Sequence, residues 1–448
     1  MNRLIKISKG LDLPVAGEVA DFDRVESRRA ARVAVVPDDF HGFVPKVLVK
    51  EGDTVKAGTP LLYDKRDKSM VIVSPCSGTV ESVVRGERRH IERVVILPDG
   101  NDGHERLTPV TAAASKEEIK QYLKKSGLWV LMRQRPYDIV PEPDCEPRDI
   151  FVTGFDSAPL AAPYSPDMAD AAAAVALLAR ITDGKVWVSR RSGSAVADIA
   201  GAEMIDVAGP HPSGNAGVLI AAIRPVNKGE QVISLTLETL CRIGHSVRTG
   251  EYDGSARVAL CGPEVKEPKM IATMMGADIK SVTAGDITDD HRHHRLISGN
   301  VLTGFNEGTE GYLRYPYTQV TVIAEGDDVD EFMGWASLSP RKMSCSRSFP
   351  SRILEKFTRR RFSPDARLLG GRRALIMSEE YDRFMPMDIM AEYLLKAIMS
   401  RDIEKMEQLG IYEVAPEDFA LGEYADTSKT ETQRIVREGL DYLRKELM

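Results

Sequence analysis

The sequence has few cysteines, and they are widely scattered. The five, Cys76, Cys145, Cys241, Cys261 and Cys345, stand at least 20 positions apart in a chain of 448 residues. This spacing excludes a local zinc knuckle and a CxxCxxC iron–sulfur motif. Scattered thiols are typical of proteins in a reducing cytoplasm.

Long apolar runs and an excess of positive charge are also absent. The longest apolar run, residues 171–179, is far shorter than the roughly 20 residues that a membrane-spanning helix needs. The first residues show no apolar core or cleavage site of an export signal, so export is not expected. Lys and Arg total 60 against 67 acidic residues, a net charge of -7. Nucleic-acid binding is therefore not expected.

The usual motifs of nucleotide binding and catalysis are missing as well. The chain contains no GxGxxG, no GxxxxGK[ST], no nucleophile elbow and no HExxH. Without glycines at a strand–helix turn, backbone N–H groups cannot approach a pyrophosphate. The nearest substitute, GPHPSGNAG at 209–217, could hold an anion, but a turn that packs a helix on a sheet explains it better. No catalytic residue and no metal ligand are predicted.

What is present predicts several domains. Short β-branched segments between Gly and Pro turns predict a small sandwich or barrel within residues 1–105. Strands and helices alternate in residues 106–255, which favours a doubly wound α/β domain. Residues 256–334 predict a smaller β-containing domain. Residues 335–373 form a basic connector, and residues 374–448 are predicted to be helical.

Individual elements can be assigned in the last two thirds of the chain. Helices are expected at 116–125 and 166–180, and strands at 149–153 and 185–189. Two apolar stripes predict C-terminal helices: Met390, Leu394 and Ile398 in the first, and Val436, Leu440, Leu443 and Leu447 in the second.

Residues 51–80 have the layout of a biotinyl/lipoyl-type barrel-sandwich. They contain a Gly-Asp turn, Lys68 on a hairpin between two strands, and SPCSGTV. Lys68 stands near the position where lipoylated carriers place their modified lysine, which suggests a swinging-arm carrier. A carrier normally continues into a flexible Ala/Pro linker, and none follows here. A docking module with a solvated Lys68 is therefore the favoured interpretation.

Residues 129–137 combine aromatic and guanidinium side chains. Rings stack on planar ligands and guanidinium groups donate to carbonyl oxygen, so Trp129, Arg133, Arg135 and Tyr137 are the predicted contacts of a quinone. An amphipathic segment turned into the core explains the same residues at least as well.

Two charged segments allow a plain and a specific interpretation. The basic block at 341–373 contains Arg359, Arg360 and Arg361. It is either a solvated loop or a docking contact with anionic lipid or an acidic partner. The segment 291–294, HRHH, resembles a metal patch, but an exposed polar loop is the better interpretation because further ligands are lacking nearby.

Several segments together resemble one family, NqrA, which forms the A component of the bacterial Na+-translocating NADH:quinone oxidoreductase. The match keeps the order of the family and spans nearly the whole chain. The segments are IKISKGLDLP at 5–14, SPCSGTV at 74–80, SGLW at 126–129 with Arg135-Pro136, FVTGFD at 151–156, GPHPSGNAG at 209–217, LCGPEV at 260–265, ISG at 297–299 with LTG at 302–304, and FMPMDI at 384–389.

The resemblance implies a fold and a setting. It implies a barrel-sandwich, a Rossmann-like α/β domain, a β-grasp (SLBB-like) domain and a helical C-terminal domain. It also implies a peripheral subunit on the cytoplasmic face of the inner membrane, bound to five sister subunits, B to F, that carry FMN, FAD and a 2Fe–2S cluster. The assembly passes electrons from NADH to ubiquinone or menaquinone and moves Na+ outward.

The family is itself similar to the flavin- and NADH-binding subunit of respiratory complex I. There a glycine-rich loop that grips FMN follows SGL, whereas this chain has WVLMRQRP at 129–136, and no cysteine triplet ends the chain. The resemblance therefore implies no tightly bound cofactor in this chain, with a quinone as a possible ligand near the altered loop. The alternative is a free-standing soluble protein, either a flavin-dependent NADH dehydrogenase or a lipoyl-type carrier.

Overall fold

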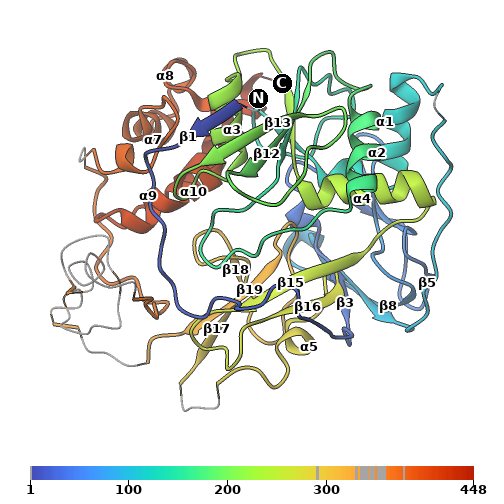
Figure 1. Ribbon diagram of the computed structural model, residues 1–448, viewed down its shortest axis with the longest axis horizontal. Helices are drawn as coiled ribbons and strands as arrows, with labels where there is room; N and C mark the ends of the chain where they lie inside the picture. Colours follow the sequence, from blue (N-terminus) through green and yellow to red (C-terminus); the bar gives the residue numbers. More distant parts are fainter. Residues whose placement is uncertain are drawn as a thin grey trace.

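The computed structural model describes residues 3–111, 113–288, 292–327, 331–332, 336, 343, 349–350, 360–376 and 379–447. In this part of the chain, four β-sheets and a group of C-terminal helices pack against one another (Figure 1). None of the helices described there has the length and apolarity that crossing a bilayer requires.

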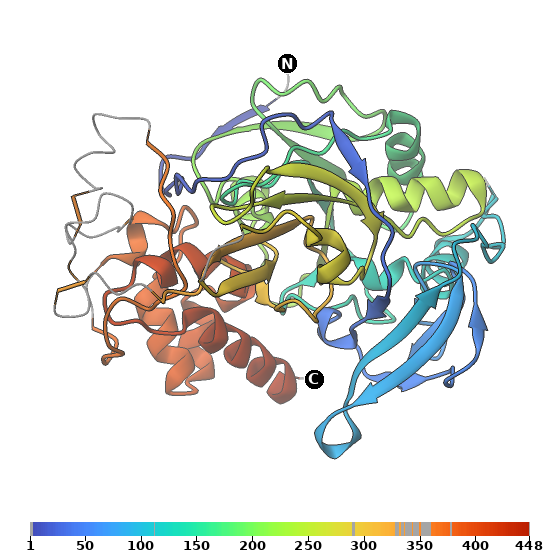
Figure 2. The same ribbon diagram turned by 90° about the horizontal axis from the view of Figure 1, so that it is seen from below.

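Two small sheets form a sandwich near the N-terminus. One contains β3 (Val33–Val35), β9 (Ile91–Pro98), β8 (Gly78–Arg85) and β5 (Thr54–Val55), and the other β4 (Pro45–Val47), β6 (Pro60–Asp64) and β7 (Val71–Val73). Leu61, Leu62 and Met70 are fully buried in its core. Gly52 and Gly58 have positive φ, which allows the tight turns between its strands. The β8–β9 hairpin projects from the molecule (Figure 2).

A six-stranded sheet has the order β1–β13–β12–β11–β14–β10. Its strands are β1 (Arg3–Lys6), β10 (Arg133–Arg135), β11 (Ile150–Thr153), β12 (Val186–Arg191), β13 (Glu203–Ala208) and β14 (Val232–Thr236). Neighbours pair in parallel, except that β10 is antiparallel to β14.

Helices cover both faces of this sheet, as a buried parallel sheet requires. Side chains of β11 alternate between two cores: Ile150 and Val152 pack with α2 (Met168–Leu178) and α4 (Leu237–Thr249), and Phe151 packs with α3 (Ala216–Ile223). Figure 1 shows α2 and α4 side by side. The prediction of an α/β region is confirmed to this extent.

The helices and strands predicted for this region are confirmed within two residues at each end. The helix predicted at 116–125 is α1 (Lys116–Lys125), which begins at a capping box between Ser115 and Glu118. The predicted helix 166–180 is α2, whose N-cap Asp167 accepts backbone N–H bonds. The starts of α1 and α2 are marked in the sequence by their N-cap residues, and they could therefore be predicted.

A second six-stranded sheet is mixed and has the order β18–β17–β19–β15–β16–β2. Its strands are β2 (Val25–Ser27), β15 (Ser255–Cys261), β16 (Lys269–Met274), β17 (His294–Ser298), β18 (Phe305–Asn306) and β19 (Gln319–Ala324), with α5 (Ile279–Thr283) after β16. The N-terminal residues thus join two sheets, because β1 pairs with β13 and β2 with β16 (Figure 1).

The C-terminal part is helical, as predicted. It consists of α7 (Ala391–Met399), α8 (Ile403–Gln408), α9 (Ala420–Ala425) and α10 (Thr432–Leu447). Leu394, Ile398 and three residues of the second stripe are buried. Met390 is 56% exposed because α7 begins only at the next residue, and Leu447 is 44% exposed at the chain end.

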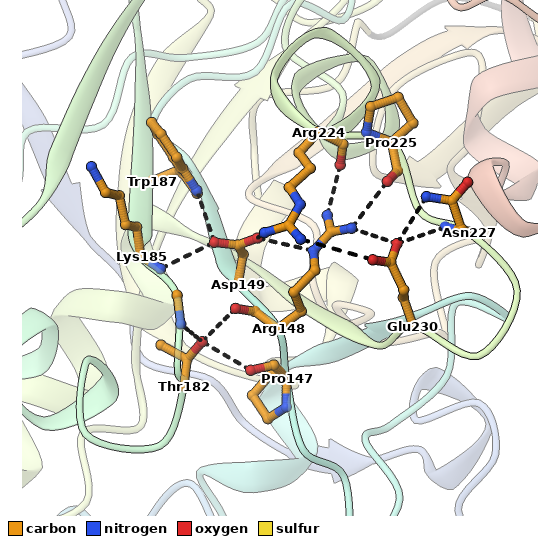
Figure 3. Close-up of polar contacts among 11 residues, drawn as sticks. Pro147, Arg148, Asp149, Thr182, Lys185, Trp187, Arg224, Pro225, Asn227 and Glu230 are labelled. Atoms are coloured by element: carbon orange, nitrogen blue, oxygen red, sulfur yellow. Dashed lines mark hydrogen bonds and ion pairs between the residues drawn. The ribbon is translucent and has the colours of Figure 1, made fainter.

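The amino-terminal edge of the α/β sheet is closed by a polar network (Figure 3). Asp149, just before β11, accepts hydrogen bonds from Lys185 N–H (3.0 Å) and Trp187 Nε1–H (3.3 Å). Arg148 pairs with Asp149 (3.0 Å) and Glu230 (2.5 Å). The donors and acceptors of this network are hydrogen-bonded to one another, so this edge of the sheet has a structural role. A ligand is therefore expected at the opposite edge.

Candidate functional site

A cavity of about 510 Å3 lies at the carboxyl ends of the parallel strands. Residues 153–156 after β11 and 234–238 at the end of β14 line it. The chain proceeds from β11 to β12 on one side, whereas β14 lies on the other side, so this is the topological switch point where open α/β sheets bind ligands. The wall also contains residues within 131–138, 158–164 and 211–216. It is completed by residues within 38–41, 300–319 and 416–437.

The chain leaves β11 through Gly154 toward this cavity. A Cβ on Gly154 would lie 2.0 Å from the carbonyl oxygen of Ser189, so a side chain does not fit there. Asp156, two residues later, lines the cavity and accepts a hydrogen bond from Ala158 N–H at 2.7 Å. The surrounding protein desolvates this carboxylate and raises its pKa.

Arg135, on β10, is the buried cation of the cavity wall. Its guanidinium forms ion pairs with Asp138 (3.4 Å), Glu417 (3.0 Å) and Asp418 (3.5 Å), and its side chain is 2% exposed. Desolvation raises the pKa of Glu417 above its usual value, although 43% of that side chain is exposed where it faces the cavity. Arg437 donates to the backbone oxygen of Asp138 (3.2 Å).

The sandwich contributes a second buried ion pair. Arg314 donates to Asp39 at 2.6 Å, yet burial raises the pKa of Asp39 to about 6. Arg133 donates to the backbone oxygen of Asp39 at 2.6 Å, and its guanidinium lies 5.7 Å from the ring centre of Tyr315. The wall therefore presents guanidinium groups beside an aromatic ring.

His211 lies in the turn at 209–217, between β13 and α3. Its backbone N–H donates to Asp12 (2.8 Å), and its Nδ1 lies 3.0 Å from the hydroxyl of Ser157. The side chain is 4% exposed and Nε2 has no partner. Burial lowers the pKa of the imidazole to about 4, so the ring is neutral at neutral pH.

The structure brings together two of the four residues predicted to contact a quinone. Arg133 and Arg135 both line the cavity. Trp129 is fully buried and its ring N–H donates to the carbonyl oxygen of Pro141 at 2.8 Å. Tyr137 is half-buried and packs against the core of the C-terminal helices. Quinone contact by these residues stays a prediction.

The predicted docking arginines lie only partly within the described residues. Arg359 falls outside them and Arg360 is exposed. Arg361 forms an ion pair with Glu18 and donates to the backbone oxygen of Val15 at 3.4 Å, so it is bound to the N-terminal segment.

Lys68 and the histidine patch at 291–294 lie outside the cavity wall. Lys68 is exposed on the β6–β7 hairpin, next to Asp67, which pairs with Lys124 at 3.1 Å and so holds the hairpin on α1. His291 lies outside the described residues, and His293 is exposed beside Asp327. The prediction of an exposed loop is wrong for His294, which begins β17 and whose side chain is 13% exposed. Within the described ranges, no three His, Cys, Asp or Glu side chains are grouped so as to hold a metal ion.

Four residues of the cavity wall were not predicted as site residues: Asp39, Asp156, His211 and Glu417. Asp156 had a usable signal, since it follows a buried strand directly and parallel strands share their carboxyl edge. His211 stands in the turn at 209–217, for which a turn that packs a helix on a sheet was the favoured interpretation and an anion cradle the alternative. Glu417 had no local signal, because it stands 282 positions from its partner Arg135.

Comparisons with known proteins agree over almost the whole chain. Family models match at residues 5–99 (NqrA N-terminal barrel-sandwich hybrid domain), 114–252 (NqrA second alpha/beta domain) and 257–307 (NQRA C-terminal domain). The chain is 34% identical to the NqrA protein of the Na(+)-translocating NADH-quinone reductase of Pasteurella multocida (strain Pm70), covering 99% of this chain and 100% of that protein. The corresponding protein of Serratia proteamaculans (strain 568) is 36% identical, again covering 99% of this chain and 100% of that protein. A solved NAD+-reducing nickel–iron hydrogenase in the H2-reduced state matches 48% of this chain and 49% of its own, at 15% identity and a TM-score of 0.32.

Proposed function

The chain belongs to the NqrA family, and we propose that it is the NqrA component of a Na(+)-translocating NADH-quinone reductase. The observation that carries this proposal is the full-length match: 99% of this chain and 100% of each relative are covered at 34% and 36% identity. The chain is thus part of an oxidoreductase that translocates an ion, and its work is done within that complex.

In this function the chain joins five sister subunits, B to F, which hold FMN, FAD and a 2Fe–2S cluster. The complex passes electrons from NADH to ubiquinone or menaquinone and moves Na+ outward. This chain sits peripherally on the cytoplasmic face of the inner membrane and is attached through its partners. The resemblance of the motifs in the sequence supports these assignments.

The quinone headgroup binds in the cavity at the carboxyl edge of the α/β sheet. Arg133 and Arg135 at the wall offer guanidinium donors for carbonyl oxygen, and Tyr315 offers a ring for stacking. Stacking of the ring by Trp129 or Tyr137 belongs to the same proposal, although neither side chain lines this cavity. The chain itself supplies binding surface and holds no cofactor tightly.

The finer fold assignments belong to the same proposal. Residues 106–255 form a Rossmann-like domain, and the strand order β13–β12–β11–β14, with β11, β12, β13 and β14 following one another in sequence, supports it. Residues 256–334 form a β-grasp domain, residues 1–105 include the barrel-sandwich, and residues 374–448 form a helical domain without a cluster. The connector at 335–373, with Arg359, Arg360 and Arg361, docks on acidic loops of a membrane subunit or on lipid headgroups.

Co-purification tests the proposed function. We expect an affinity tag on this chain to recover all six subunits from solubilised membranes, with NADH-dependent quinone reduction, and crosslinks from residues 341–373 to a membrane subunit. Untagged cells are the control. A chain recovered alone with bound yellow flavin and NADH dehydrogenase activity, or with a mass increment on Lys68, would instead support the free-standing dehydrogenase or the lipoyl carrier.

A further inference from the structure

The edge strand β4 of the N-terminal sandwich has an outer face that mixes apolar and basic side chains. Residues 44–50 alternate between exposed and partly buried positions, and the partly buried Val47 and Val49 pack against the main core. Successive side chains of a strand point to opposite faces, so the exposed ones share the outer face: Val44, Lys46, Leu48 and Lys50. A solvated sheet face is normally polar, yet Val44 is 43% and Leu48 51% exposed.

Three lysines gather around these two aliphatic side chains. Lys65 follows β6, and its backbone N–H donates to the carbonyl oxygen of Val44 at 2.9 Å, so it lies directly beside β4. Lys46, Lys50 and Lys65 are all exposed, and none of them is in an ion pair within the described ranges. We call this set the β4 face: Val44, Lys46, Leu48, Lys50 and Lys65.

The nearby carboxylates do not neutralise the β4 face. Asp64 pairs with Arg66 at 2.8 Å, and Asp67 pairs with Lys124 at 3.1 Å. Residues 44–68 contain six basic and four acidic residues, and two of the four acids are thus already paired. The β4 face is therefore locally positive, although the whole chain has a net charge of -7. Its charge favours an acidic partner.

The backbone of β4 indicates the shape of that partner. β4 is the first strand of the order β4–β6–β7, so in the described part of the chain no strand pairs with its outer side. A free sheet edge binds extended segments by strand addition. Apolar and basic side chains alternate along the β4 face, and an extended partner can present apolar and acidic side chains with the same spacing. Lipid headgroups would pair with the lysines but would leave the backbone edge unused.

We propose that the β4 face docks an extended, acidic segment of a sister subunit, which adds to the sheet beside β4 and covers Val44 and Leu48. This inference rests on the proposed function, which supplies the sister subunits. It goes further by assigning the docking surface of the sandwich and the chemistry of its partner. Figure 2 shows the sandwich, in blue, at one side of the molecule.

Lysines at an exposed sheet edge also protect against aggregation, and this structural role predicts a different result. Any charge at the edge gives that protection, whereas docking of an acidic segment needs a positive charge. The double variant Lys46→Glu with Lys65→Glu keeps the edge charged and reverses the sign. Its thermal unfolding should match that of the wild-type chain, because both sites are exposed.

Recovery of sister subunits from solubilised membranes by the tagged full-length chain measures docking. We expect the double variant to lower this recovery about 5-fold or more, and Leu48→Ser to lower it as well. The matched controls should leave it unchanged: Lys6→Glu with Lys280→Glu, at exposed lysines of β1 and α5, and Leu447→Ser, at a leucine that is 44% exposed. Equal recovery by the double variant and the wild-type chain would overturn the inference.

A photo-crosslinking residue in place of Leu48 identifies the occupant in the assembled complex. We expect crosslinks to a segment of another subunit with an excess of Asp and Glu. Crosslinks to phospholipid, to a segment without that excess, or to no protein would overturn the inference. If the wild-type chain recovers no sister subunit, the proposed function fails too, whereas wild-type recovery with the wrong crosslink contradicts this inference alone.

Discussion

Arg135 and Glu417 are ion-pair partners, but their charges matter unequally to the fold. Arg135 is 2% exposed and faces three carboxylates, so Arg135→Leu leaves buried negative charge unpaired, at a cost of about 3–5 kcal/mol. Glu417→Gln keeps the shape of the side chain and replaces a carboxyl whose pKa is already raised. We therefore expect the free energy of unfolding to fall by less than about 1 kcal/mol. Urea unfolding of both variants at pH 7 measures the difference. Equal losses would contradict this account.

His211 gives the stability a defined pH dependence. Its pKa is about 4 in the folded chain against an ordinary value of 6.5, so below pH 6.5 the unfolded chain binds a proton that the folded chain rejects. The contribution of the neutral His211 to the free energy of unfolding is fully present above pH 6.5. It is lost as the pH falls through 4, and the total loss is about 3 kcal/mol. His211→Gln should remove this part of the acid sensitivity. Urea unfolding at pH 7.5, 6 and 5 measures it, and parallel curves for both chains would argue against it.

At the scale of elements, the contact between α2 and α4 depends on a glycine. A Cβ on Gly244 of α4 would lie 1.8 Å from the backbone oxygen of Asp170 in α2, and backbone cannot move aside as a side chain can. We expect Gly244→Ala to destabilise the fold by about 1–3 kcal/mol. Gly439→Ala, which meets only the side chain of Ile398 at 2.7 Å, should cost less, and Gly371→Ala, with open space around it, should cost least. Thermal unfolding ranks the three variants, and any other order would count against the prediction.

At the scale of the whole molecule, α10 is tied to the N-terminal sandwich through Glu142. This carboxylate is 7% exposed and pairs with Arg444 of α10 and, at 2.8 Å, with Arg66 of the β6–β7 hairpin. Glu142→Gln should weaken this tie by about 1–3 kcal/mol and speed hydrogen exchange in α10. Glu438→Gln, which removes an exposed pair on the same helix, is the matched control and should change exchange little. Unchanged exchange in Glu142→Gln would mean that apolar packing alone holds the helix.

The sequence by itself located what depends on neighbours along the chain. The start of α1 follows from the Ser115–Glu118 capping box, and α10 from its apolar stripe. The order of the motifs over the full length indicated the family. Because the glycine-rich loop is absent, the sequence predicted no nucleotide-binding site. These signals are local because capping and amphipathic periodicity involve residues only a few positions apart.

Only the tertiary structure decided what meets at the cavity. It placed the carboxylate of Asp418 against Gly217 of α3, brought Glu417 to Arg135 across 282 positions, and turned Trp129 into the core. It also added β1 and β2 to two separate sheets. The reason is physical: burial, ion pairing and the desolvation that shifts a pKa arise from groups distant in sequence, and no local pattern records which of them become neighbours.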